Sequence, residues 1–108
     1  MANTPKTVNI EVTLDPALAM IWRIQGELQE RILGEHPANM SDEAKSTYIR
    51  EQGFALIAEL FEAMNAVNWK SWASRRGIEN PEEYRSELCA DVFRFFINLC
   101  LVGGITSG

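Results

Sequence analysis

Apolar residues alternate with polar ones near the start of the chain. Within residues 7–14 (TVNIEVTL) the even-numbered positions are all apolar and the odd-numbered positions are all polar. This spacing of two is typical of a β-strand. A single strand leaves its backbone hydrogen-bonding groups unpaired, so we expect this segment to pair with another copy of the chain or to lie as an extended arm on the helices.

Three later segments carry the spacing of three and four residues that indicates an amphipathic helix. Each follows a residue that is favoured at a helix N-cap, and these residues are Asp15, Ser41 and Asn80. Proline at the first helical position strengthens the first and third start signals. The predicted helices span about residues 16–33, 42–67 and 81–101.

The apolar residues of each predicted helix form a stripe that we expect to be covered. The stripe of the first helix consists of Leu18, Ile21, Leu28 and Ile32, widened by Trp22 and Ile24. That of the second consists of Ile49, Gly53, Leu56, Ile57, Leu60, Met64 and Val67. The third helix is expected to bury Tyr84, Leu88, Val92, Phe95, Phe96 and Leu99.

These elements predict an all-α fold, a helical bundle of three main helices with an extended N-terminal arm. Residues 34–40 and 68–80 are predicted loops. We expect one domain over residues 1–108, with the arm at 1–14 and the helical core at 15–105. A chain of 108 residues buries a modest fraction of its surface. We therefore expect oligomerisation, as a homodimer or homotetramer, to complete the bundle.

The chain has 15 acidic and 10 basic residues, a formal charge of -5. That balance disfavours a duplex nucleic-acid binder and suits a protein that concentrates divalent cations. The N-terminus lacks the apolar core of a signal peptide, and no run approaches the roughly 18 apolar residues of a membrane span. We expect a cytoplasmic protein without a membrane partner.

Cys89 and Cys100 lie about 16 Å apart on one predicted helix, which is too far for a disulfide bond between them. Because free cysteines are usually buried, we expect two buried free thiols.

Two acidic stripes border the apolar faces of the second and third helices. One consists of Gln52, Ala55, Glu59, Glu62 and Ala66, and the other of Glu83, Glu87, Asp91, Arg94 and Asn98. If the two helices pack antiparallel, four carboxylates converge: Glu59, Glu62, Glu87 and Asp91. Converging carboxylates need a cation, and oxygen ligands alone select Mg²⁺ or Mn²⁺. The alternative is two solvated acidic faces paired with nearby lysine and arginine.

The loop between these helices, NWKSWASRRGIEN, supplies basic and aromatic side chains. Lys70, Arg75 and Arg76 can hold phosphate oxygens. Trp69 and Trp72 can stack on a nucleobase. The alternative is that both tryptophans anchor the core or a dimer interface.

Four segments taken in order resemble the all-α NTP pyrophosphatases, the superfamily of the dimeric dUTPases and the MazG-like enzymes. They are IQGELQERI, ELFE, NWKSW and ELCADVFRFFINLCLVGGI. The resemblance covers about residues 18–105 and is closest to the dimeric dUTPase branch. It implies that Glu59 and Glu62 form a first metal-binding pair and that Asp91 belongs to a second. It also implies that Gln25 faces the base and that Trp69 and Lys70 close on the nucleotide.

The chain departs from that branch in three ways. The second acidic pair is usually spaced three, whereas Glu87 and Asp91 are four apart and Leu88 stands at the expected place. Gln29 stands where the branch has asparagine. The branch usually continues with more helix after a segment like LVGGIT, so this chain is either a compact relative or one whose missing half another polypeptide supplies.

The expected activity is Mg²⁺-dependent hydrolysis of a (d)NTP, with dUTP the favoured substrate, to the monophosphate and pyrophosphate. The expected catalytic residues are Glu59, Glu62 and Lys70. The expected substrate-binding residues are Gln25, Gln29, Trp69, Lys70, Arg75, Arg76, Arg94 and Asn98. Two alternatives stay open, a purine-directed MazG-like pyrophosphatase and a non-catalytic helical module that needs a partner chain.

Overall fold

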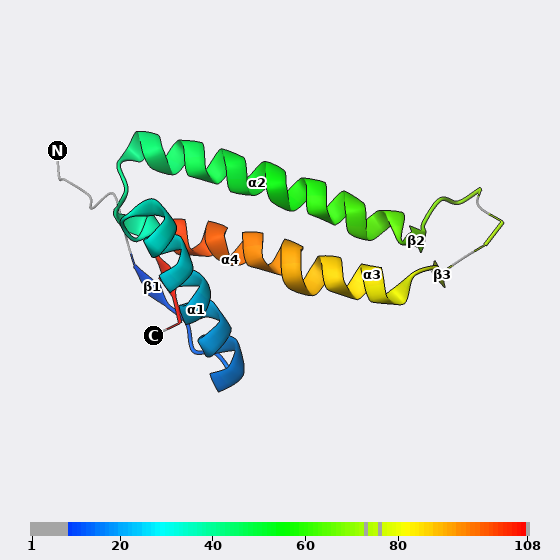
Figure 1. Ribbon diagram of the computed structural model, residues 1–108, viewed down its shortest axis with the longest axis horizontal. Coiled ribbons are helices and arrows are strands. Elements are labelled where there is room, and N and C mark those ends of the chain that lie inside the picture. The colour runs from blue at the N-terminus through cyan, green and yellow to red at the C-terminus, as the bar shows by residue number, and fades with distance from the viewer. Residues whose placement is uncertain (1–8, 73, 76, 108) are drawn as a thin grey trace.

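A computed structural model describes residues 9–72, 74–75 and 77–107. Its helices are α1 (Pro16–Leu33), α2 (Asp42–Asn65), α3 (Pro81–Ser86) and α4 (Phe93–Val102), and a π-helical turn, η2 (Glu87–Val92), joins α3 to α4. Helix α2 runs antiparallel beside the continuous rod of α3, η2 and α4, and α1 crosses at the α4 end (Figure 1). The predicted all-α bundle of three main helices is confirmed.

The three predicted start signals act as caps. The side chains of Asp15, Ser41 and Asn80 each accept a hydrogen bond from a backbone N–H in the first turn of the helix that follows. Helix α1 ends at Gly34, whose φ of 83° is the left-handed conformation that glycine adopts without a steric penalty. A short 3₁₀ helix, η1 (Pro37–Asn39), lies inside the predicted loop that leads to α2.

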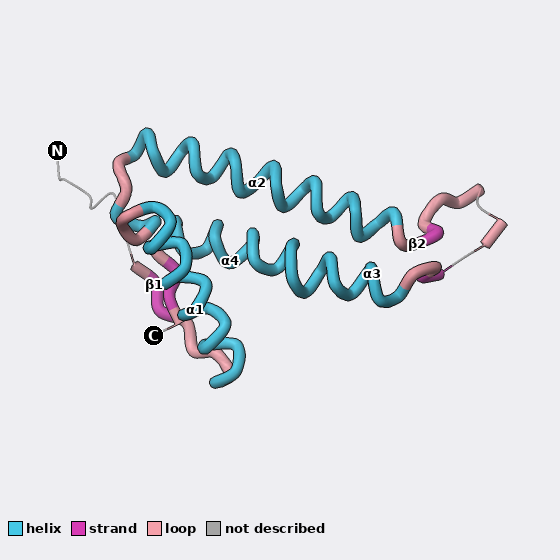
Figure 2. Tube along the Cα trace, in the orientation of Figure 1, coloured by secondary structure: helices cyan, strands magenta, loops and turns pink. Residues whose placement is uncertain are grey.

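Among the described residues, four short strands form two separate pairs (Figure 2). Strand β1 (Ile10–Glu11) pairs in parallel with β4 (Ile105–Thr106). Strand β2 (Val67–Asn68) pairs antiparallel with β3 (Gly77–Ile78), so the segment predicted as a plain loop contains a hairpin. The N-terminal arm therefore pairs with the far end of its own chain. Residues 7 and 8 of the predicted strand lie outside the described residues.

Helix α4 forms the centre of the described core. Its most deeply buried residues include Ile97, Asn98, Leu101 and Val102. Trp22 of α1 packs against Ile97 and Leu101, and its indole Nε1 donates a hydrogen bond to the carbonyl oxygen of Ile105, 3.3 Å away. That contact ties β4, and through it β1, to α1.

The predicted apolar stripe of α1 is largely exposed. Ile24 and Ile32 are 55% and 66% exposed, and Trp22 is the stripe member that joins Gln25, Gly26 and Gln29 among the buried residues of α1. The prediction holds for Trp22 and was wrong for the exposed residues, because α1 packs against α4 through the side that carries Trp22 and the two glutamines. The thiol prediction was also half wrong, because Cys100 is buried whereas Cys89 is exposed.

The second and third predicted stripes are also only partly covered. Ile49, Ile57 and Leu60 on α2 and Phe96 on α4 are each at least 40% exposed. The radius of gyration of the Cα atoms is 17.0 Å, whereas a compact domain of about 100 residues has one near 13 Å. The chain is thus an elongated helix pair with one crossing helix, and its apolar flanks face outward.

Candidate active site

Three carboxylates meet between α2 and the π-helical turn. Glu59 comes from α2, and Glu87 and Asp91 come from η2. Each offers one oxygen, and these three oxygens lie within 4.8 Å of one another. All three residues are half-buried. We call them the acidic trio.

Glu87 lies at the centre of the repulsion within the acidic trio. Its Oε2 atom is buried and accepts no hydrogen bond from any described residue. The pKa of Glu87 is raised to about 7, first because its proton is shared in a hydrogen bond with Glu59, then because of burial and the negative charges of Glu59 and Asp91. At neutral pH the carboxylates of the trio therefore compete with one another for a proton, and a divalent cation can take the place of that proton.

Glu62 is the fourth predicted metal ligand, and the structure does not bring it into the acidic trio. It is exposed and lies one helical turn beyond Glu59 on α2. Its role as a ligand stays a prediction. Arg94 lies at the rim, where its guanidinium is 3.7 Å from a carboxylate oxygen of Asp91 and stacks on the ring of Phe95. The trio thus has one arginine beside it that can contact a phosphate.

A chain of buried and half-buried amides connects the three helices at the α4 end. Gln25 Nε2 donates to Asn98 Oδ1 over 2.9 Å, and Asn98 Nδ2 donates to Gln52 Oε1 over 2.8 Å. We call Gln25, Asn98 and Gln52 the amide ladder. Asn98 is only 2% exposed, so both ends of its amide are committed to protein partners. Its assignment to substrate binding stays a prediction.

Gln29, one turn from Gln25, belongs to a second polar contact. Tyr48 donates its hydroxyl hydrogen to Gln29 Oε1 over 2.7 Å. Burial raises the pKa of Tyr48 to about 12, so the phenol stays neutral and the amide of Gln29 is held in one orientation. Sequence reasoning missed Tyr48. The only signal was its spacing, because Tyr48 lies one helical turn before Gln52 on the face that carries the acidic stripe.

The aromatic and basic loop lies at the far end of the helix pair (Figure 1). Trp69 and Trp72 are 52% and 76% exposed, so neither is a core anchor in this chain. The Lys70 ammonium lies 5.9 Å from the centroid of each indole ring. Trp69 and Lys70 line a small cavity of about 190 Å³. Arg75 contacts Glu79 at 3.7 Å, and Arg76 lies outside the described residues.

A larger cavity, about 410 Å³, lies elsewhere, between the end of α1 and the start of α2. Glu43 and Glu51 line it, and their negative charges disfavour a triphosphate there. Glu51 and Glu59 are eight residues apart on α2, about 12 Å along the helix axis. We therefore place the candidate chemistry at the acidic trio and not at this larger cavity.

Comparison with known proteins gives one result. The model of the dUTPase family matches residues 17–107, a span that includes the acidic trio, the amide ladder and the Trp-Lys loop. No curated protein and no solved structure matches. Within the described ranges, no helix combines the length and apolar character needed to cross a membrane. The match spans most of the chain, and the chain therefore belongs to the dUTPase family of all-α NTP pyrophosphatases.

Proposed function

We propose that this chain hydrolyses dUTP to dUMP and pyrophosphate with the help of Mg²⁺. The observation that carries the proposal is the acidic trio, in which Glu87 Oε2 is buried without a hydrogen-bond partner among the described residues. Oxygen donors and no thiolate or imidazole suit Mg²⁺ or Mn²⁺. Glu59, Glu87 and Asp91 would hold the ion, and Glu62, one turn farther along α2, is the fourth ligand that we propose.

The side chains of this chain have separate tasks in the proposed reaction. Mg²⁺ bound at the trio would neutralise phosphate charge and polarise the α-phosphate. Glu59 orients a water molecule and accepts its proton as the water oxygen attacks the α-phosphorus. The bond from that phosphorus to the bridging oxygen breaks, and pyrophosphate leaves with its charge stabilised by Lys70.

The amide ladder supports a base-binding role for Gln25, and the hydrogen bond from Tyr48 supports one for Gln29. Gln52 and Glu59 are seven residues apart on α2, so the ladder lies about 10 Å along the helix from the acidic trio. A nucleotide whose α-phosphate lies at the trio can therefore extend its base toward this end of the bundle. The hydrogen bonds from Tyr48 and to Asn98 fix which amide group of each glutamine is available. Trp69 and Trp72 belong to the loop at the opposite end of the helix pair, so stacking on this nucleoside would require the loop to fold back along the pair over the trio.

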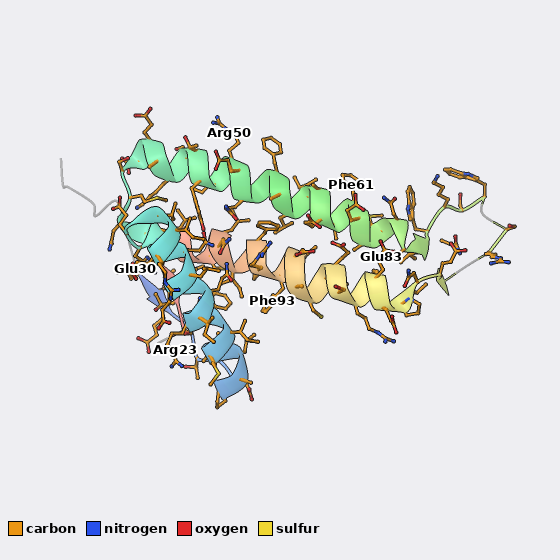
Figure 3. All side chains as sticks on the ribbon, viewed as in Figure 1. Arg23, Glu30, Arg50, Phe61, Glu83 and Phe93 are labelled. Carbon is orange, nitrogen blue, oxygen red and sulfur yellow. The ribbon has the colours of Figure 1, made fainter. Side chains whose placement is uncertain are left out.

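We further propose that a second copy of this chain covers the outward apolar flanks. These flanks include Phe61, which is 62% exposed on the side of α2 that faces away from α3 (Figure 3). Light scattering should give twice the 12.2 kDa chain mass. A mass of one chain at micromolar concentration would remove the homodimer, and four times that mass would favour the tetramer instead.

The activity test is a panel of all NTPs and dNTPs with Mg²⁺, read by pyrophosphate release. We expect dUTP to be cleaved fastest by the parent chain, and Glu59→Gln to lose at least a hundredfold in kcat, a loss in the range of general-base removal. Glu30→Gln, on an exposed part of α1 away from the trio, is the matched charge control (Figure 3). If the parent chain cleaves no nucleotide faster than Glu59→Gln does, the proposed enzymatic activity is excluded. Calorimetry without heat from Mg²⁺ would then favour the non-catalytic module, and preference for a purine nucleotide would favour the MazG-like alternative.

A further inference from the structure

The helical rod that carries Glu87 and Asp91 changes its winding where these two residues lie. Helix α3 ends at Ser86, the π-helical turn η2 occupies Glu87–Val92, and α4 begins at Phe93. The backbone N–H of Phe93 donates to the carbonyl oxygen of Leu88, five residues earlier. A bond over five residues places one more residue in the turn than an α-helix holds. Such turns are rare and occur mainly at functional sites.

This extra residue changes which side chain faces α2. In an α-helix each residue advances by roughly 100° around the helix axis. The residues three and four positions after a given residue therefore lie on its face, one to either side of it. A turn that holds one residue more lets a pair spaced four take the place of a pair spaced three. Glu87 then stands where Leu88 would stand in an uninterrupted α-helix. In the structure it is Glu87 that meets Glu59 and Asp91.

The packing on both sides of η2 explains why the extra residue is confined to this turn. Helix α3 packs against α2 on one side, and α4 packs against both α1 and α2 on the other. If the rod were a regular α-helix of the same length, one of these two segments would rotate by roughly one residue relative to α2. The π-helical turn lets both segments keep their own register.

We propose that the π-helical turn is the positioning element of the metal site, because it absorbs one residue and so presents Glu87 and Asp91 with the geometry of a pair spaced three. This inference rests on the proposed function, since it gives the acidic trio the role of holding the ion. The extra residue does not change the packing of the core, because Cys89 and Ala90 within the turn are both exposed.

Deletion of Ala90 tests the proposal. It leaves Glu87 and Asp91 three apart in a chain that can form a regular α-helix. We expect this variant to bind Mn²⁺, titrated alone by calorimetry, within threefold of the parent affinity and to melt within 3 °C of it. The matched control is deletion of Ser86, an exposed residue one position before the turn. It also shortens the rod by one residue but leaves the carboxylates four apart, so it should lose either tenfold in Mn²⁺ affinity or 5 °C or more in melting temperature.

A second variant keeps the chain length. The double substitution Glu87→Leu and Leu88→Glu moves the carboxylate to a spacing of three while the turn is retained, and we expect at least a tenfold loss of Mn²⁺ affinity. The proposal is overturned if this variant binds like the parent, or if the Ala90 deletion unfolds or loses as much as the Ser86 deletion. If the parent binds no Mn²⁺, the proposed function fails instead, and the melting temperatures of the two deletions still test the register of the turn.

Discussion

Replacing Asn98 by alanine should destabilise the folded chain more than almost any other single polar substitution. Asn98 is 2% exposed and forms two hydrogen bonds, one from Gln25 and one to Gln52. The substitution leaves a buried amide N–H on Gln25 without an acceptor. It also leaves the carbonyl of Gln52 without a donor, although Gln52 is half-buried and can regain water.

The expected loss follows from these two unpaired groups. A buried polar group that loses its partner costs about 1–3 kcal/mol, and we assign the larger share to Gln25 because it is the more buried. The sum is about 2–4 kcal/mol for Asn98→Ala, a large part of the roughly 5–15 kcal/mol that stabilises an ordinary domain. Urea unfolding at one fixed protein concentration measures it, since the proposed dimer would make apparent stability depend on concentration.

Two comparisons make this test decisive. Asn65→Ala removes an exposed asparagine near the end of α2 and should change the free energy of unfolding by less than about 0.5 kcal/mol. Double-mutant cycles of Asn98→Ala with Gln25→Ala and with Gln52→Ala should each give a coupling energy of about 0.5–3 kcal/mol. A loss no larger than that of the control, or cycles without coupling, would show that the amide ladder does not hold the helices together.

Three further predictions concern the turn, the helix end and the loop. The folded pKa of Glu87 is about 7 against an ordinary value of 4.5, so without Mg²⁺ its contribution to stability is present below about pH 4.5 and is lost as pH rises through about 7. Melting temperatures of the parent should fall over that interval, and a Glu87→Gln profile parallel to the parent's would contradict this. Gly34→Ala should cost about 1 kcal/mol in urea unfolding because of the positive φ, and an unchanged midpoint would refute the left-handed cap. Trp72→Ala should leave the melting temperature unchanged, because the side chain is 76% exposed. It should raise KM for dUTP about tenfold by removing a stacking surface. An unchanged KM would show that Trp72 is not part of the site.

The helix ends were predictable from sequence because they depend on neighbouring residues. Each N-cap side chain bonds to a backbone group two or three residues away. The pairing of β1 with β4 was not predictable in this way, because it joins the two ends of the chain. Hydrophobic periodicity identified the apolar side of α1 correctly but could not say what covers it. In a single chain no described segment covers most of it, and the side that carries Trp22, Gln25 and Gln29 is buried instead.

The candidate site was predictable to a similar extent. Antiparallel packing of two acidic stripes predicted a meeting of carboxylates, and the structure brings three of the four together. The exclusion of Glu62 could not be read from spacing, because residues three and four apart share a helix face equally well. The π-helical turn was also hidden, since its bond pattern depends on packing at both of its ends. The amide ladder was missed because buried glutamines look like solvent-facing ones in a sequence.

The acidic trio and the amide ladder have opposite effects on the stability of the same helix pair, and they act at different positions along it. The ladder and the apolar cluster around Ile97 hold the helices together at the α4 end. The trio lies farther along, where the hydrogen bond shared with Glu59, burial and the neighbouring negative charges raise the pKa of Glu87, so that ionisation of this group opposes folding. A cation at the trio would offset this repulsion and stabilise the fold by RT ln(1 + [Mg²⁺]/Kd). The same ion would keep Glu87 ionised, so saturating Mg²⁺ should remove the pH dependence of stability in the parent and leave Glu87→Gln little affected.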